Sequence, residues 1–96
     1  MPAYALVELT IDDRDGMGPY MEKVADTVAA FEGRYLVRAG ETEVLEGTLG
    51  GHPLKVLIEF PSMAAARDWY RSDAYQAILS HRLDNSRANF ILVEGV

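Results

Sequence analysis

Two charged side chains inside apolar stretches of the chain could do chemistry. Glu59 interrupts the run Leu-Lys-Val-Leu-Ile-Glu-Phe at residues 54–60, and Arg38 belongs to the run Tyr-Leu-Val-Arg-Ala at residues 35–39. The alternation in the first run is typical of a strand with one core face. A charge on the other face is costly to remove from water unless it is paired. We therefore expect Arg38 to lie between Glu59 and Glu8, a carboxylate of the apolar run at residues 4–11.

This predicted trio has a functional and a structural interpretation. In the functional one, Arg38 holds an anionic or enolate oxygen of a small substrate, and Glu59 or His52 accepts a proton. His52 is a candidate base because its loop, Gly-Gly-His-Pro, directly precedes the Glu59 strand, although loop histidines are more often solvated. In the structural interpretation, which is the commoner one, the charges form ion pairs that set the register of an interface.

Two tyrosines are candidate ligand-binding residues together with Glu8. Tyr70 and Tyr75 lie at helical spacing on either side of Ser72. Core packing is the commoner explanation for such a pair, and a place at a cavity mouth is the alternative. The two histidines are not at ligand spacing, and the chain has no cysteine. We therefore expect no metal site and no cofactor.

The periodicity of the rest of the chain predicts the order βαββαβ. Strands are expected at residues 4–11, 35–39, 54–60 and 88–94, and helices at residues 17–31, ended by Gly33, and from Ser62 to Asn85 with a break at Ser72. Residues 41–51, punctuated by glycine, predict an extended hairpin arm. The order indicates a single α+β domain over residues 1–96: a ferredoxin-like sandwich of a four-stranded antiparallel sheet with the helices on one face.

The face of this sheet without helices is predicted to carry an unusual mixture of leucines and charges. The residues expected on it are Tyr4, Leu6, Glu8, Leu36, Arg38, Lys55, Leu57 and Glu59. Those expected under the helices are Val7, Leu9, Val37, Val56, Ile58 and Phe60, with Ile91 and Val93 or their alternates. A water-facing sheet would be more uniformly polar. The mixture therefore predicts a homodimer with a chamber between two sheets.

The composition limits the classes of partner. A net charge of −6 and a pI of about 4.7 argue against binding to nucleic acid or anionic membranes. No apolar run approaches the roughly 18 residues of a membrane helix, and the N-terminal residues lack the basic segment of a signal peptide. The absence of cysteine fits a reducing compartment. We expect a cytoplasmic protein whose partners are a second copy of itself and a small organic molecule.

Four stretches of the chain resemble a known family. Residues 33–40, 45–47, 58–62 and 66–75, in this order, are similar to the uncharacterised family called domain of unknown function 1330. The resemblance implies the dimeric α/β-barrel superfamily, in which two ferredoxin-like units pack sheet to sheet. Wider relatives include cofactor-free monooxygenases and muconolactone isomerase-like proteins, so the resemblance implies a fold rather than a reaction. Ala39 departs from the family pattern, which tends to have glycine there.

These observations support three functions. The first is a small homodimeric protein that binds a small organic molecule in a cavity on the helix-free sheet face. The second is a cofactor-independent monooxygenase-like or isomerase-like enzyme that uses Arg38 and Glu59. The third is a non-catalytic dimeric module in which the charges only fix the register of the interface.

Overall fold

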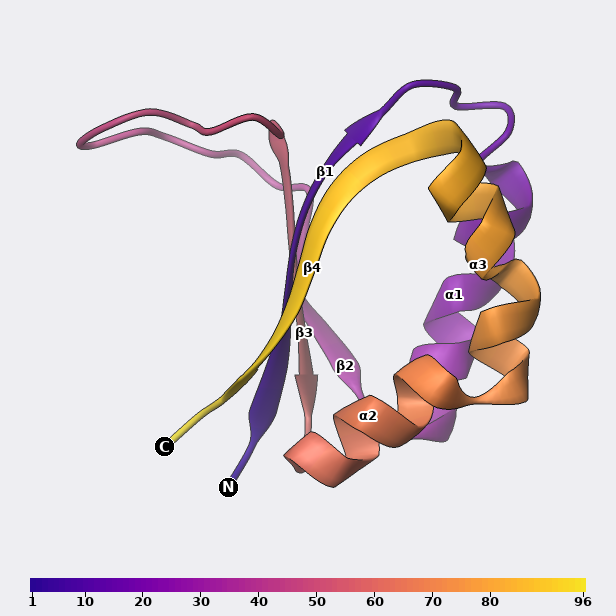
Figure 1. Ribbon diagram of the computed structural model, residues 1–96. Coiled ribbons are helices and arrows are strands. Elements are labelled where there is room, and N and C mark those ends of the chain that lie inside the picture. Colours follow the sequence, from indigo (N-terminus) through magenta and orange to yellow (C-terminus); the bar gives the residue numbers. More distant parts are fainter.

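The computed structural model describes all residues, 1–96, and has two layers: a sheet, and helices packed against one of its faces (Figure 1). The elements in chain order are β1 (Ala3–Ile11), α1 (Gly18–Ala30), β2 (Arg34–Arg38), β3 (Leu54–Phe60), α2 (Met63–Arg71), α3 (Asp73–Asn85) and β4 (Ser86–Glu94). The strand order is β2-β3-β1-β4, and all neighbours are antiparallel. The predicted α+β ferredoxin-like fold is confirmed.

Two serines cap the helices of the second helical segment: Ser62 begins α2, and Ser72 separates α2 from α3. The hydroxyl oxygen of Ser62 accepts a hydrogen bond from the backbone N–H of Ala65 at 3.1 Å. The hydroxyl oxygen of Ser72 accepts one from the backbone N–H of Tyr75 at 3.2 Å. Each serine satisfies a donor that has no partner inside its helix. The predicted cap at Ser62 and the predicted break at Ser72 are both confirmed.

The core lies between the sheet and the helices. Its fifteen buried residues are Ala3, Ala5, Val7, Leu9, Met17, Tyr20, Val24, Val28, Ile58, Phe60, Ala66, Trp69, Tyr75, Ile78 and Leu79. Alternate residues of β1 belong to this set because successive side chains of a strand point to opposite faces. In β4 the alternates Phe90 and Leu92 pack against the core, whereas Ile91 and Val93 are exposed on the other face.

The end of α1 differs from the predicted glycine cap. The helix ends at Ala30, and the left-handed residue beyond it is Glu32, with φ 61°. Gly33 serves a different purpose, since a Cβ atom at this position would lie 2.6 Å from Cε1 of Phe60. Glycine at position 33 therefore allows the backbone to approach a buried ring closely.

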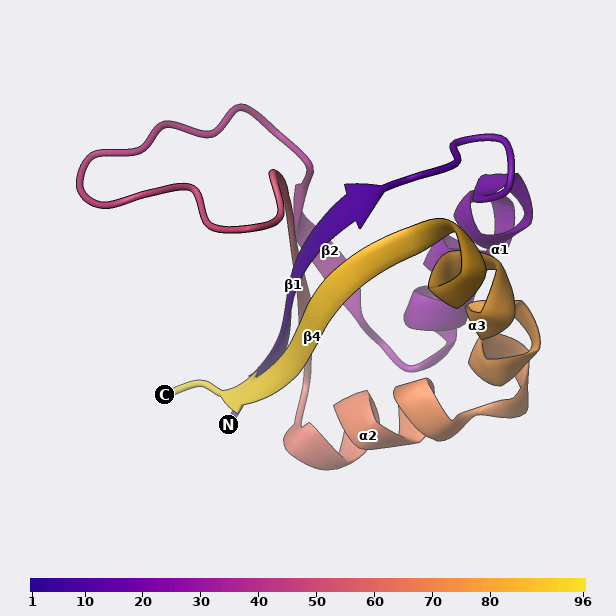
Figure 2. The same ribbon diagram turned by 45° about the horizontal axis from the view of Figure 1, so that its top comes forward.

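A long arm, residues 39–53, joins β2 to β3. It contains no strand, so the predicted extension is present but the predicted hairpin pairing is not. The arm projects from the side of the sheet that has no helices (Figure 1), and the turned view shows it clear of the helices as well (Figure 2). The helix-free face and the arm therefore lie on the same side of the molecule.

Candidate functional site

Glu59 lies on the helix-free face, as predicted, but its partner is not Arg38. The Nε atom of Arg34 donates to one carboxylate oxygen of Glu59 at 2.8 Å, and the hydroxyl of Tyr4 donates to the other at 3.2 Å. Tyr4 pairs directly with Glu59 across β1 and β3. Partial burial and the hydrogen bond to Glu59 raise the pKa of Tyr4, so this phenol stays protonated and donates at neutral pH.

The predicted contact between Arg38 and Glu59 is wrong because the strand register pairs Arg34 with Glu59, and because β2 contains a bulge before Arg38. Tyr35 pairs with Ile58, but Val37 pairs with Leu57, so one residue between them, Leu36, has no partner on β3. An inserted residue moves every following side chain to the opposite face. Val37 therefore joins the helix-free face. Arg38 lies on the helix side instead, with its guanidinium carbon 4.7 Å from the centre of the Tyr35 ring.

Glu8 pairs with Lys55 rather than with an arginine. The Nζ atom of Lys55 lies 3.2 Å from a carboxylate oxygen of Glu8 and donates to the backbone oxygens of Leu49 at 2.9 Å and His52 at 2.8 Å. Lys55 thus ties the end of the arm to the sheet. The predicted trio of Glu8, Arg38 and Glu59 is replaced by two separate ion pairs.

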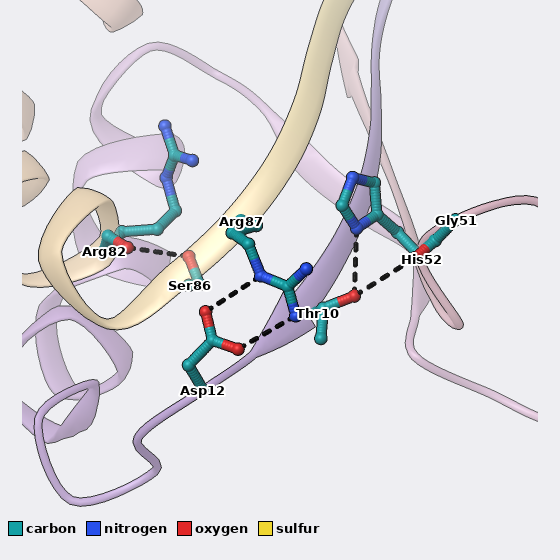
Figure 3. A network of polar contacts seen from close by, with 7 residues as sticks. All are labelled: Thr10, Asp12, Gly51, His52, Arg82, Ser86 and Arg87. Atoms are coloured by element: carbon teal, nitrogen blue, oxygen red, sulfur yellow. Dashed lines mark hydrogen bonds and ion pairs between the residues drawn. The ribbon is translucent and has the colours of Figure 1, made fainter.

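His52 lies at the opposite end of the helix-free face from Glu59. Its Nδ1 atom is 2.9 Å from the hydroxyl oxygen of Thr10, near the end of β1, whereas Glu59 contacts Tyr4 near the start of that strand. Figure 3 shows the Thr10–His52 contact beside the ion pair of Asp12 and Arg87, in which two nitrogen–oxygen distances are 3.0 and 3.1 Å. Arg87 holds the pKa of Asp12 below its usual value. His52 and Glu59 are therefore not placed to act on one substrate atom together.

A shallow hollow of about 490 Å³ lies beside the Glu8–Lys55 pair on the helix-free face. Its walls come from β1, β2, β3 and β4, and they are Leu6, Val7, Glu8, Val37, Lys55, Val56, Leu57, Asn89 and Ile91. Six of these nine residues are hydrophobic. The combination of apolar walls with one carboxylate, one ammonium and one amide suits a partly apolar organic molecule.

Tyr70 and Tyr75 lie on the other side of the sheet, within an aromatic cluster. The centre of the Trp69 ring lies 4.3 Å from that of Tyr75 and 5.8 Å from that of Phe90. The ring centres of Tyr70 and Tyr75 are 5.3 Å apart. Tyr75 is fully buried, and its hydroxyl is 2.8 Å from that of Tyr20. Neither Tyr70 nor Tyr75 lines the hollow of the helix-free face. Core packing accounts for Tyr75.

Arg82 is a candidate that the interpretation of the sequence missed. Only 5% of the residue is exposed, and it lines a cavity of about 90 Å³ under the helices. The sequence did carry a signal. Arg82 follows Tyr75, Ile78 and Leu79 at the three- and four-residue spacing of the apolar stripe of α3. A charge on such a stripe points toward the core.

No group of three or more histidine, aspartate or glutamate side chains is placed to hold a metal ion. None of the three helices is long and apolar enough to cross a membrane.

Solved structures with the same fold include proteins from three bacteria. A protein of unknown function from Rhodopseudomonas palustris is 18% identical, with a TM-score of 0.73 over 99% of this chain and 82% of that one. A dimeric ferredoxin-like protein of unknown function from Jannaschia sp. CCS1 is 19% identical, with a TM-score of 0.70 over 99% of this chain and 100% of that one. SnoaB, a cofactor-independent oxygenase from Streptomyces nogalater, is 11% identical, with a TM-score of 0.57 over 99% of this chain and 93% of that one.

Sequence comparison gives the family. No curated protein matches the chain. The likenesses to solved structures are below 20% identity and establish the fold alone. The family model described as Domain of unknown function (DUF1330), in contrast, matches residues 2–96, which is nearly the whole chain. This chain therefore belongs to the DUF1330 family.

Proposed function

We propose that the protein forms a homodimer through its helix-free face, and that the two faces enclose a chamber that binds a small, partly apolar organic molecule. The observation that carries the proposal is the exposure of large apolar side chains on this face. Ile91 is 55% exposed, and Leu6 and Val93 are each 40% exposed. Contiguous apolar surface on a small domain is typical of an interaction site.

The arm supports the same interface. It projects from the helix-free side (Figure 1) and exposes Val44 and Leu45, the latter by 85%. A second copy packed on the helix-free face would give these side chains an apolar surface to cover. The dimeric ferredoxin-like neighbour from Jannaschia sp. CCS1 has the same fold, which makes a sheet-to-sheet dimer the natural arrangement to test.

The hollow supports the binding of a small molecule. Two copies of the face would bring two hollows together, each with apolar walls and a Glu8–Lys55 pair at its edge. Such a chamber suits a molecule with an apolar body and a few polar atoms. Binding without reaction is the form we propose, because the candidate acid–base groups His52 and Glu59 lie at opposite ends of the face.

Sedimentation of two charge variants tests the dimer. Ile91→Glu places a carboxylate in the middle of the proposed interface, and Leu83→Glu is the matched control, since Leu83 is 58% exposed on α3, away from the helix-free face. We expect the wild-type chain and Leu83→Glu to sediment as dimers and Ile91→Glu as a monomer. A monomeric wild-type chain, or a dimeric Ile91→Glu variant, would contradict the proposal.

The chamber needs a separate measurement. We expect small esters and ketones to shift the methyl NMR resonances of Leu6 and Leu57 in the wild-type dimer and to leave those of monomeric Ile91→Glu unchanged. A dimer whose Leu6 and Leu57 resonances respond to none of these compounds would favour the non-catalytic module, in which the interface is closed and dry.

A further inference from the structure

Arg82 is a buried cation for which the protein supplies no anion. Its Nε atom has no hydrogen-bond partner, and none of the three ion pairs of the chain includes it. Figure 3 shows its side chain directed away from the Asp12–Arg87 pair, although Arg87 follows it closely in the sequence. An unpaired buried charge is among the costliest features a fold can contain.

Aromatic rings compensate for this cost only in part. The guanidinium carbon of Arg82 lies 5.2 Å from the centre of the Phe90 ring and 5.8 Å from that of Tyr20. Such contacts stabilise a cation but leave its Nε–H group without an acceptor. Burial raises the pKa of both Tyr20 and Tyr75, so these phenols are neutral at pH 7 and do not balance the charge.

The cavity that Arg82 faces has apolar walls and no acidic residue. Its fifteen lining residues include thirteen hydrophobic ones, and the other two are Arg38 and Arg82. Arg38 and Met21 are exposed, so the cavity reaches the surface beside them, between α1 and the end of β2. Two arginines and no carboxylate give the cavity a positive local charge, even though the whole chain carries a net charge of −6.

We propose that this cavity binds a short aliphatic carboxylate, with its carboxylate on the guanidinium of Arg82 and its alkyl chain against the apolar walls. Arginine matches a carboxylate because its N–H groups form a planar fork. The volume sets the length of the chain. About 90 Å³ is room for several waters, whereas an apolar cavity that holds benzene measures roughly 150 Å³. The site is separate from the helix-free face and does not depend on the proposed dimer.

Titration with butyrate and its neutral isostere, butyramide, tests the proposal. The Nε–H NMR resonance of Arg82 reports directly on the atom that has no partner. We expect butyrate to move this resonance in a saturable manner, and butyramide and inorganic phosphate to leave it in place. An unmoved resonance, or equal effects of butyrate and butyramide, would overturn the proposal. A response to phosphate alone would overturn the ligand class.

Three variants separate binding from folding. Arg82→Met keeps the length of the side chain and removes its charge, so we expect butyrate affinity to fall about ten- to a hundredfold while the melting temperature without ligand stays equal or rises. Arg87→Met, the matched control on the other face, should bind butyrate as the wild-type chain does. Arg82→Lys retains the charge without the planar fork and should bind more weakly than wild type. If Arg82→Met does not fold, Arg82 is structural and the proposal fails, as it also does if Arg82→Met binds with unchanged affinity.

Discussion

The hydrogen bond between Trp69 and Thr27 should stabilise the aromatic cluster that surrounds Arg82, and its loss should lower the free energy of unfolding. Trp69 is fully buried, and its indole Nε1 donates to the hydroxyl oxygen of Thr27 at 3.0 Å. The same hydroxyl donates to the backbone oxygen of Val24 at 2.7 Å. Thr27→Val replaces the hydroxyl by a methyl group of nearly the same size, so the change removes a hydrogen-bond acceptor and leaves the shape of the core intact.

The expected magnitude follows from the group that loses its partner. A buried donor without an acceptor costs about 1–3 kcal/mol, and Val and Thr have similar helix propensities. We therefore expect Thr27→Val to lower the free energy of unfolding by about 2 kcal/mol. For a domain of this size, that corresponds to a fall in melting temperature on the order of 10 °C.

Urea denaturation followed by far-UV circular dichroism measures this loss, because that signal remains when Trp69, the single tryptophan, is replaced. Thr27→Ser is the control, because it retains the hydroxyl, and it should retain most of the stability. In a Trp69→Phe background no indole N–H is left to satisfy, so Thr27→Val should cost much less there. The reasoning would be refuted if Thr27→Val and Thr27→Ser were equally stable, or if the cost of Thr27→Val were the same in both backgrounds.

Two further predictions concern backbone strain and alkaline pH. Ala39 adopts φ 55°, so Ala39→Gly should raise the free energy of unfolding by roughly 0.5–1 kcal/mol in urea denaturation. Ala29→Gly within α1 is the control and should lower it by about 1 kcal/mol. Equal effects of the two substitutions would contradict the strain argument. Burial raises the pKa of Tyr20 and Tyr75 above 10.0, so the stability they confer is complete below about pH 10 and is lost as the pH rises further. Tyrosinate absorbance and urea midpoints across this range should show the loss, and Tyr20→Phe should reduce its slope.

Much of the fold could be predicted, because at many positions local sequence rules, such as strand alternation and helix capping, agree with the tertiary packing. The alternation along residues 4–11 gives the core face of β1, and the serines at 62 and 72 cap the helices where their hydroxyls meet free N–H groups. Where local rules and packing diverge, the prediction failed. Gly33 looked like a helix cap, but its lack of a side chain makes room for Phe60.

The candidate site also combines features that the sequence predicts with features that only the structure shows. The sequence by itself determined that Glu59 lies on the helix-free face, because the period of two holds along the continuous strand β3. Only the tertiary structure decided that Arg34 and Tyr4 contact it, because the strand registers pair both residues with Glu59, and the bulge at Leu36 moves Arg38 to the helix side. A bulge depends on how two strands pair, and the residues of one strand do not reveal it.

Arg82 shows the same distinction most clearly. The sequence places it on the apolar stripe of α3, which is enough to direct it inward. Whether a buried arginine is paired depends on every element that packs around it. The structure brings Tyr20, Tyr75 and Phe90 to Arg82 from α1, α3 and β4, but no carboxylate. A charge left unpaired in this way results from tertiary packing, because the chain has fifteen acidic residues and only the fold keeps them all away from Arg82.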